Sequence, residues 1–373
     1  MTEIYLIRHT QAEGNVYHAM QGHWDGDVTA LGLRQIDALA ERFRGVKIDA
    51  LYSSDLTRAM LTADAIRRFQ PMELHTVFDL REINVGPWEA RFFADVLYEQ
   101  PLESELFIHR AEDFYLPGAE RYDDVRRRAS AALEKIAREN DGRTIAVVSH
   151  GVTIRCLLSQ MLGKSLNDPA LPICGNTGVC HLFFEDGRYS IDYINDCSHL
   201  ASLGLPEWSR TPNLRAEPFS PAAEPLFYTA CYSDAWQAAH GTLEGFSPAT
   251  YLAAAESHHR ADGEAVLRFF DGDSAAGLLD LDPQRGAYAG YGWVSLLYLN
   301  EDYRGRGLGV QLLGRALMHF RRQGRRAVRL QAAEDNTAAL RFYERHGFRR
   351  LSSESGRFGK LFLMEYRFGE SHV

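Results

Sequence analysis

A proline-rich stretch near the middle of the chain constrains its fold more than any other feature. Residues 200–225 carry five prolines, at 206, 212, 218, 221 and 225, and show no hydrophobic periodicity. Such a segment is typical of a linker, because proline interrupts both helices and sheets. The chain has 373 residues, and the parts on either side are each long enough to bury a core. We therefore predict a domain at 1–199, a linker at 200–225 and a second domain at 226–373.

The first part alternates between strand-like and helix-like patterns. Short apolar runs predict strands at 4–7, 50–52 and 144–149, and amphipathic patterns predict helices at 29–44, 55–69, 120–139 and 152–162. A hairpin is expected at 178–194, turning at Asp186-Gly187. Alternation of this kind predicts an α/β domain with a mainly parallel sheet.

The second part has a different order of elements, so the chain is a fusion and not a duplication. Its patterns predict strands at 226–232, 265–270, 274–281, 291–299, 326–332, 348–352 and 360–367, and helices at 247–260, 307–323 and 336–346. A glycine-rich loop lies at 304–309. We expect a mixed α+β domain.

Charge and cysteine usage exclude several classes of protein. The net charge is −9, which disfavours non-specific binding to nucleic acid or to anionic membranes. The five cysteines form no C-x-x-C pair, as expected of free thiols in a reducing cytosol. No signal-peptide pattern opens the chain, and no apolar run approaches the ~18 residues that span a bilayer. We expect a cytoplasmic protein without nucleic-acid or membrane partners, and a homo-oligomer stays an open alternative.

Polar side chains follow two of the predicted strands of the first part. Arg8 and His9 come at the end of strand 4–7, and His150 follows strand 144–149. Ligands of open α/β sheets collect beyond the carboxyl ends of strands. Two imidazoles and a guanidinium at such ends are suited to surround one anion.

Several blocks in this part resemble the histidine phosphatase superfamily, the phosphoglycerate-mutase-like enzymes. They are LIRHTQAEGN from Leu6, QGHWDGDVTALGLRQ at 21–35, YSSDLTRAMLTA at 52–63, LREINVGPWE at 80–89 and VVSHG at 147–151. The resemblance covers about residues 1–198 and implies a three-layer α/β/α domain.

The resemblance also implies a mechanism. His9 is the nucleophile that becomes a phosphohistidine, and Glu82 is the proton donor to the leaving alcohol and later the base for water. Neighbouring guanidinium groups are expected to keep His9 neutral. The implied catalytic residues are His9, Arg8, Arg58, Glu82 and His150. The implied phosphate contacts are Arg8, Asn15, Gln21, Gly22, Arg58 and His150. The cationic side chains supply the charge, so no metal or other cofactor is expected in this domain.

The resemblance leaves a phosphatase and a mutase as alternatives. A mutase retains a bisphosphate and needs additional cations, whereas residues 90–116 are mainly acidic. Thr10 stands where glycine is commoner in the motif, as in phosphatase members. Both observations favour hydrolysis of a small phosphomonoester, with a phosphoglycerate-mutase-type phosphotransferase as the alternative.

The glycine-rich loop of the second part suits a pyrophosphate. It follows a predicted strand and opens a helix, and glycines together with a helix N-terminus present free N–H groups to an anion. YLNEDYRGRGLGVQLLGRAL and EDNTAALRFYERHGFRRL resemble the two signature blocks of GNAT acetyltransferases, and the resemblance covers about residues 226–368. It implies acetyl-CoA as the cofactor, with Tyr343 as the acid that protonates the departing thiolate. The implied cofactor contacts are Leu297, Leu299, Arg304, Gly305, Arg306, Gly307, Leu308, Gly309, Asn336 and Tyr343.

The sequence leaves the general base and the acceptor of the acetyl group open. The predicted strand 291–299 holds no glutamate, so ordered water and Glu301 are both candidates for the base. A small amine and a protein amino group are both candidates for the acceptor. Two hypotheses follow for the whole chain: a bifunctional enzyme, or a phosphatase regulated by an acetyl-CoA-sensing domain.

Overall fold

The computed structural model describes the chain except for residues 202–203, 205–211, 357–358 and 370–373. It divides the chain into two compact units that correspond closely to residues 1–209 and 210–373. Each unit is built around its own sheet. In the described ranges, no helix is both long enough and apolar enough to cross a bilayer.

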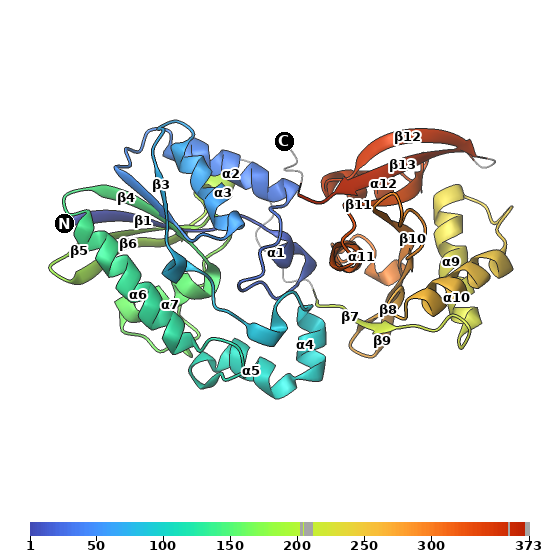
Figure 1. Ribbon diagram of the computed structural model, residues 1–373, viewed down its shortest axis with the longest axis horizontal. Coiled ribbons are helices and arrows are strands. Elements are labelled where there is room, and N and C mark those ends of the chain that lie inside the picture. The colour runs from blue at the N-terminus through green and yellow to red at the C-terminus, as the bar shows by residue number, and fades with distance from the viewer. Residues whose placement is uncertain (202–203, 205–211, 357–358, 370–373) are drawn as a thin grey trace. The chain divides into compact units, whose positions relative to one another are not determined.

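The first unit has a six-stranded sheet with the order β3-β2-β4-β1-β5-β6 (Figure 1). The strands are β1 (Thr2–Arg8), β2 (Ala50–Ser53), β3 (Leu74–Thr76), β4 (Thr144–Ser149), β5 (Val179–Glu185) and β6 (Arg188–Asp196). The first four pair in parallel, and β5 and β6 are antiparallel. The predicted mainly parallel sheet is confirmed.

Helices cover both faces of this sheet, which gives the three layers. They are α1 (Glu13–Tyr17), α2 (Ala30–Phe43), α3 (Thr57–Arg67), α4 (Phe93–Glu99), α5 (Pro101–His109), α6 (Tyr122–Glu139), α7 (Gly151–Leu162) and α8 (Ser198–Ala201). Alternate residues of β1 face opposite layers, as a strand requires. Leu6 lies in one buried cluster with Leu133 of α6, and Ile7 lies in the other with Leu39 of α2. Because β1 and β4 pair in parallel at the centre of the sheet, their carboxyl ends lie next to each other.

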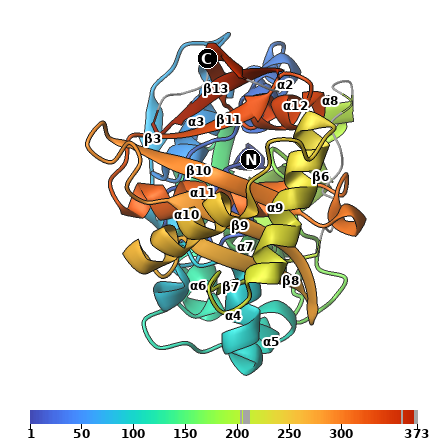
Figure 2. The same cartoon turned by 90° about the vertical axis from the view of Figure 1, so that its right-hand side faces the viewer.

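The second unit has a seven-stranded sheet with the order β12-β13-β11-β10-β9-β8-β7. The strands are β7 (Arg215–Pro218), β8 (Val266–Asp271), β9 (Ser274–Asp282), β10 (Tyr291–Leu299), β11 (Ala327–Ala333), β12 (Arg349–Gly356) and β13 (Gly359–Arg367). The helices are α9 (Pro225–His240), α10 (Pro248–Ala261), α11 (Gly309–Arg322) and α12 (Thr337–Arg345). Among the described residues only β10 and β11 pair in parallel, so the sheet is mixed and mostly antiparallel. The predicted mixed α+β domain is confirmed. Helices α9 and α10 lie over the face turned to the viewer in Figure 2, and α11 lies behind it.

Two predictions at the start of the second part are wrong. Residues 226–232, predicted as a strand, belong to helix α9, which begins at Pro225 and ends at His240, followed by Gly241 in the left-handed conformation. The aromatic residues there suggested a strand, but Tyr228 and Cys231 are buried at helical spacing and Pro225 occupies the first turn, which proline favours. Residues 215–218, predicted as linker, form β7 and pair with β8. Part of the remaining predicted linker, at 202–203 and 205–211, lies outside the described residues.

Candidate functional sites

The end of strand β1 brings the two predicted histidines of the first domain together. Arg8 is the last residue of β1 and pairs with Ser149 of β4. The backbone N–H of His9 donates to the carbonyl of Ser149 over 2.9 Å. The rings of His9 and His150 consequently lie 5.0 Å apart between centroids. Both side chains are buried.

A short hydrogen bond fixes the tautomer of His9. Its Nδ1 lies 2.6 Å from the carbonyl oxygen of Thr10, which only accepts, so Nδ1 carries the hydrogen and Nε2 keeps its lone pair. Thr10 is itself held by Thr62 Oγ1, which accepts from its N–H, and by the carbonyl of Gly32, which accepts from its hydroxyl. Burial lowers the pKa of His9 well below its usual value, and the charges of Arg58 and Arg8 lower it further. His9 is therefore neutral near physiological pH, as expected from the sequence, although burial is the first cause.

Arg58 and Arg8 are buried cations with donors left over. Arg58 of α3 is fully buried and donates to the carbonyls of Trp24 and Gly22, over 3.0 and 2.7 Å. Arg8 donates to the carbonyl of Cys174 over 2.5 Å. Burial lowers the pKa of Arg58 to about 10, so it stays cationic near neutral pH. The Nε atoms of both arginines are buried and make no hydrogen bond to any described residue. Two buried cations with unused donors form an anion site.

His150 and Gln21 add further buried polar groups without partners in the described chain. His150 precedes α7 and is 0% exposed, and neither of its ring nitrogens makes a hydrogen bond. Burial, then the charges of Arg58, His9 and Arg8, lowers its pKa well below the usual value. His150 is thus a neutral donor and acceptor in this state, and not a cation. The side-chain amide of Gln21 is also buried, and no described residue hydrogen-bonds to it. Native proteins rarely leave such groups unsatisfied, so these groups are available to a ligand or to ordered water.

Glu82 lies at the N-terminus of α7. Its Oε1 accepts from the N–H groups of Ile83 and Thr153, over 3.1 and 3.0 Å, and from the Thr153 hydroxyl over 3.2 Å. Its Oε2 accepts from the N–H of Val152 over 3.1 Å. Burial lowers the pKa values of Arg8 and Arg58, and the charge of Glu82 raises both, so the carboxylate belongs to the same electrostatic cluster. Arg128 holds the carbonyl of Glu82 over 3.0 Å.

The loop at 175–178 contributes residues that the sequence analysis missed. Asn176 Nδ2 donates to the carbonyl of His9 over 3.0 Å and to Oδ1 of the predicted Asn15 over 3.2 Å. The N–H of Thr177 donates to the carbonyls of Arg8 and His9. The loop precedes antiparallel strand β5, which begins where its neighbour β1 ends. The carboxyl ends of parallel strands predict site residues that follow a strand, whereas the antiparallel neighbour β5 brings in residues that precede one.

Glu89 is a second residue without an assigned role in the sequence analysis. Its carboxylate accepts from the N–H groups of Gly22, His23, Trp24 and Val85. It thereby holds the loop whose carbonyls, at Gly22 and Trp24, position Arg58. Glu89 ends the block LREINVGPWE, so its motif was visible but its contacts were not.

The glycine-rich loop of the second domain has the geometry of an anion site. Gly305 and Gly307 have φ angles of +72° and +76°, which favour glycine, and the loop leads into α11 at Gly309. Among the described residues, the N–H groups of Gly305, Arg306 and Gly307 have no hydrogen-bond acceptor. Leu308 is buried and anchors the loop, while Arg304 donates to the carbonyl of Leu299 over 2.8 Å. The residues present therefore fit a pyrophosphate group.

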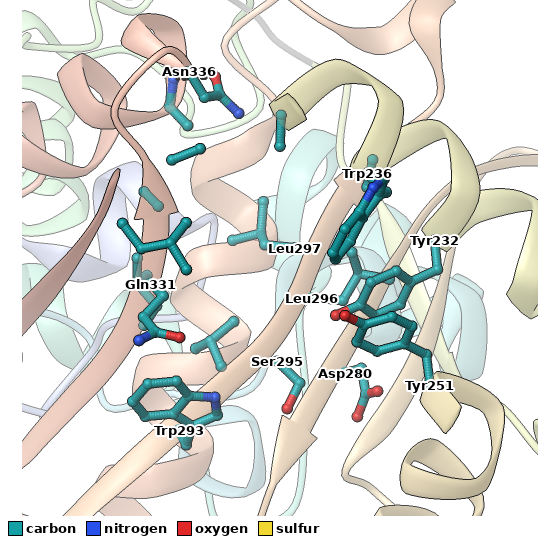
Figure 3. A pocket seen from close by; sticks show the side chains of 18 of the residues that line it. Tyr232, Trp236, Tyr251, Asp280, Trp293, Ser295, Leu296, Leu297, Gln331 and Asn336 are labelled. Atoms are coloured by element: carbon teal, nitrogen blue, oxygen red, sulfur yellow. Dashed lines mark hydrogen bonds between the residues drawn. The ribbon is translucent and has the colours of Figure 1, made fainter. Parts of the chain in front are cut away.

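Strands β10 and β11 separate beside this loop and open a cavity. They pair only from Tyr291 to Trp293, after which a bulge in β10 between Val294 and Leu296 accompanies their divergence. The cavity has a volume of about 630 Å³. Figure 3 shows Leu297 and Asn336 at its wall. The predicted Tyr343 also lines it, whereas Leu299 does not. Burial raises the pKa of Tyr343, so its hydroxyl stays protonated.

Comparison with known proteins identifies both domains. Residues 4–197 match the family described as the histidine phosphatase superfamily (branch 1), and residues 227–348 match the acetyltransferase (GNAT) family. The first domain is similar to a metal-independent phosphoserine phosphatase of Arabidopsis thaliana, with 34% identity over 55% of this chain and 86% of the relative. It is also similar to a probable phosphoglycerate mutase GpmB of Proteus mirabilis, with 29% identity over 56% of this chain and all of the relative.

Among solved structures, YhfR of Bacillus stearothermophilus superposes with a TM-score of 0.52 and 28% identity, over 54% of this chain and all of that one. The described residues hold no group of three or more His, Cys, Asp or Glu side chains placed to bind a metal ion. The chain therefore belongs to the histidine phosphatase superfamily through residues 4–197, fused to a GNAT acetyltransferase domain at residues 227–348.

Proposed function

We propose that the first domain hydrolyses small phosphomonoesters through a phosphohistidine on His9. The observation that carries this is the neutral, tautomerically fixed imidazole of His9 beside two buried arginines with unused donors. Nε2 attacks phosphorus, the P–O bond to the alcohol breaks, and the alcohol oxygen takes a proton from Glu82. Glu82 then takes a proton from water, which attacks the phosphohistidine and releases phosphate and neutral His9.

The remaining predicted residues bind the phosphoryl oxygens. Arg8 and Arg58 supply charge and planar donors, and His150 and Gln21 supply further donors. Asn15 completes the set at the edge of the loop. The predicted contact of Gly22 is not kept, because its N–H donates to Glu89 and its carbonyl accepts from Arg58. No step requires a metal.

Hydrolysis is favoured over phosphoryl transfer between positions of a bisphosphate. The arginines of residues 90–116 are Arg91 and Arg110, and each already forms an ion pair with an acid of that segment. Arg91 pairs with Glu99 and Arg110 pairs with Asp113, so a neighbouring acid offsets the charge of each arginine in this segment. Phosphoserine is the first substrate to test, because a relative at 34% identity is described as a metal-independent phosphoserine phosphatase.

The test uses the intact chain with a chromogenic aryl phosphate, phosphoserine and 3-phosphoglycerate, in the presence of a chelator. We expect phosphate release and an acid-labile phosphoprotein, both abolished by His9→Ala. His109→Ala is the matched control, because His109 is exposed on α5. Full activity of His9→Ala would refute the mechanism, and isomerisation of 3-phosphoglycerate without phosphate release would favour the mutase.

We propose that the second domain transfers an acetyl group from acetyl-CoA to an amine. The loop 304–309 would hold the pyrophosphate through the N–H groups of Gly305, Arg306 and Gly307, whereas the N–H of Arg304 donates to the carbonyl of Glu301. Leu297 and Asn336 would flank the cofactor arm, and Leu299 lies outside the cavity lining. Acetyl-CoA supplies the acetyl group as a thioester. Tyr343 lines the same cavity and keeps its proton, and in this proposal it would give that proton to the departing sulfur.

The alternative, a sensor that regulates the phosphatase, makes a different prediction. Acetyl transfer to amines with unchanged phosphatase rates would eliminate the sensor. Phosphatase rates that change with acetyl-CoA, without any transfer over an amine panel, would support it.

A further inference from the structure

The cavity of the second domain extends beyond the residues predicted for the cofactor. Its other wall is built by α9, α10 and β9, and Figure 3 shows Tyr232, Trp236 and Tyr251 grouped on it. The rings of Tyr232 and Tyr251 stack at 4.2 Å, and the rings of Trp236 and Tyr251 lie 5.7 Å apart. These aromatic side chains come from two helices that no cofactor motif includes.

A buried carboxylate lies next to this aromatic wall. Asp280 of β9 is 1% exposed and lines the cavity. It accepts from the Tyr228 hydroxyl and from Nδ1 of His258, each over 2.7 Å. Nε2 of His258 lies 3.4 Å from Asp282, so one imidazole connects two carboxylates. Burial lowers the pKa of His258, but the hydrogen bonds and charges of Asp280 and Asp282 outweigh it and raise the pKa above its usual value.

This end of the cavity favours a cation. Two carboxylates face a single imidazole. Burial raises the pKa of Asp280, and the hydrogen bonds from His258 and Tyr228 oppose that shift. With both carboxylates ionised, the group keeps a negative charge even when His258 is protonated. Aromatic faces attract cations as well, and most strongly when water is excluded. Arg285 also lines the cavity, but it stacks on Trp293 with its guanidinium carbon 3.3 Å from the ring centroid. The charge of Arg285 would repel an ammonium near Trp293, so an ammonium is favoured at the end of the cavity that holds Asp280 and Asp282.

We propose that this part of the cavity is the acceptor site, and that it binds a small primary amine with an aromatic or apolar skeleton, protonated in solution. The ammonium lies at Asp280 and Asp282, and the skeleton packs against Tyr232, Trp236 and Tyr251. His258 receives a proton from the amine. The proposal rests on the proposed acetyl transfer and names the acceptor and the base that the sequence left open.

The protons and bonds of the transfer balance with these residues. The ammonium gives its first proton to His258, which passes it to solvent. The amine nitrogen then forms a bond to the acetyl carbon as the carbon–sulfur bond breaks. Tyr343 delivers its proton to sulfur. The second proton leaves nitrogen as the amide forms, and it restores the proton of Tyr343. The net products are the N-acetyl amine, CoA thiol and one proton.

Binding tests the acceptor site without relying on catalysis. Calorimetry on the intact chain with CoA present would compare phenethylamine with its neutral analogue 2-phenylethanol. We expect phenethylamine to bind about ten-fold more tightly, the size of a cation–π and carboxylate preference in a partly dry site. Asp282→Asn should reduce that ratio toward one, while Trp236→Leu should weaken both ligands. Asp282 is preferred over Asp280 for substitution, because it is less buried and its variant is expected to fold.

A matched control lies on the same helix. Phe227 of α9 is half-buried, packs on Phe219 and does not line the cavity, so Phe227→Leu should leave both affinities unchanged. Equal affinity for the amine and the alcohol, or equal loss in Phe227→Leu and Trp236→Leu, would refute the proposal. Acetylation of amines that is insensitive to Trp236→Leu and Asp282→Asn would refute the acceptor site alone. Cation-selective binding without acetylation of any amine would instead refute the proposed acetyl transfer.

Discussion

Substituting Glu89 tests whether a single carboxylate holds the loop whose carbonyls, at Gly22 and Trp24, position Arg58. Each oxygen of Glu89 accepts two backbone N–H groups: Oε1 from His23 and Val85, over 2.7 and 3.1 Å, and Oε2 from Gly22 and Trp24, over 3.2 and 2.7 Å. In Glu89→Gln one oxygen becomes an NH₂ group, so two backbone donors face a donor. A hydrogen bond to a charged group contributes about 1.5–3 kcal/mol, and two are lost. The loop is therefore destabilised by about 3–6 kcal/mol.

The consequence reaches the phosphoryl site through Arg58. The carbonyls of Gly22 and Trp24 accept from its guanidinium, and Asp25 of the same loop pairs with it at 3.5 Å. A displaced loop therefore displaces the guanidinium. Removing one preorganised donor from a transition-state site typically costs about 10²–10³ in rate. We expect kcat/KM for an aryl phosphate to fall about 100-fold in Glu89→Gln. Inorganic phosphate should inhibit the variant more weakly. A global loss of stability would lower the amount of folded enzyme but would leave phosphate inhibition of the folded molecules unchanged.

The assay is steady-state hydrolysis by the intact chain, with circular dichroism to confirm folding. Glu99→Gln is the control, because Glu99 lies on α4 and forms only an exposed ion pair with Arg91. Near wild-type kcat/KM and phosphate inhibition in Glu89→Gln would show that the loop does not depend on this carboxylate. The positioning role of Glu89 would then be wrong.

Two further predictions concern Tyr343 and acid stability. Tyr343→Phe should lower kcat for acetyl transfer about 100-fold with the KM for acetyl-CoA nearly unchanged, measured by thiol release; an equal kcat would assign the proton donor elsewhere. His9 and His150 are neutral in the folded state with lowered pKa values, whereas the unfolded chain takes up protons below about pH 6.5. The contribution of the two histidines to the free energy of unfolding is therefore fully present above about pH 6.5. It is lost as pH falls, by up to about 1.4 kcal/mol per pH unit for each histidine. Urea unfolding near pH 7 and pH 5 checks this, and a smaller loss should appear in His150→Asn; an equal loss would contradict the contribution of His150.

The sequence predicted the strands and helices well where hydrophobic periodicity was strong. The buried strand β4 and the amphipathic helices α2 and α11 were placed within a few residues, because their patterns fit one period only. Helix α9 was misread because its first residues are aromatic and β-prone, while its helical character depends on packing against the sheet. Strand β7 was hidden among prolines, and Pro218 is tolerated because β7 lies at the edge of the sheet.

For the sites, the sequence predicted residues carried by motifs and missed those that act through backbone contacts. Arg8, His9 and His150 were expected to converge because the carboxyl ends of parallel strands are neighbours. Glu89 and Asn176 were not expected to take part, because they bind main-chain atoms and their side-chain type does not reveal which ones. The wall formed by Tyr232 and Trp236 was also invisible, since aromatic residues on a helix are usually part of a core.

The two domains are suited to bind phosphate groups in physically different ways, and the difference follows from what each would do with them. In the first, Arg8 and Arg58 are buried cations. Charge shifts during the transfer of a phosphoryl group, and fixed positive groups stabilise that charge most when water is excluded. In the second, the loop at Gly305 and Gly307 offers backbone N–H groups near the surface. That suffices for a pyrophosphate that only has to be held, because its charge stays constant through the reaction. Burying cations at the second site would incur a desolvation cost with no gain in rate.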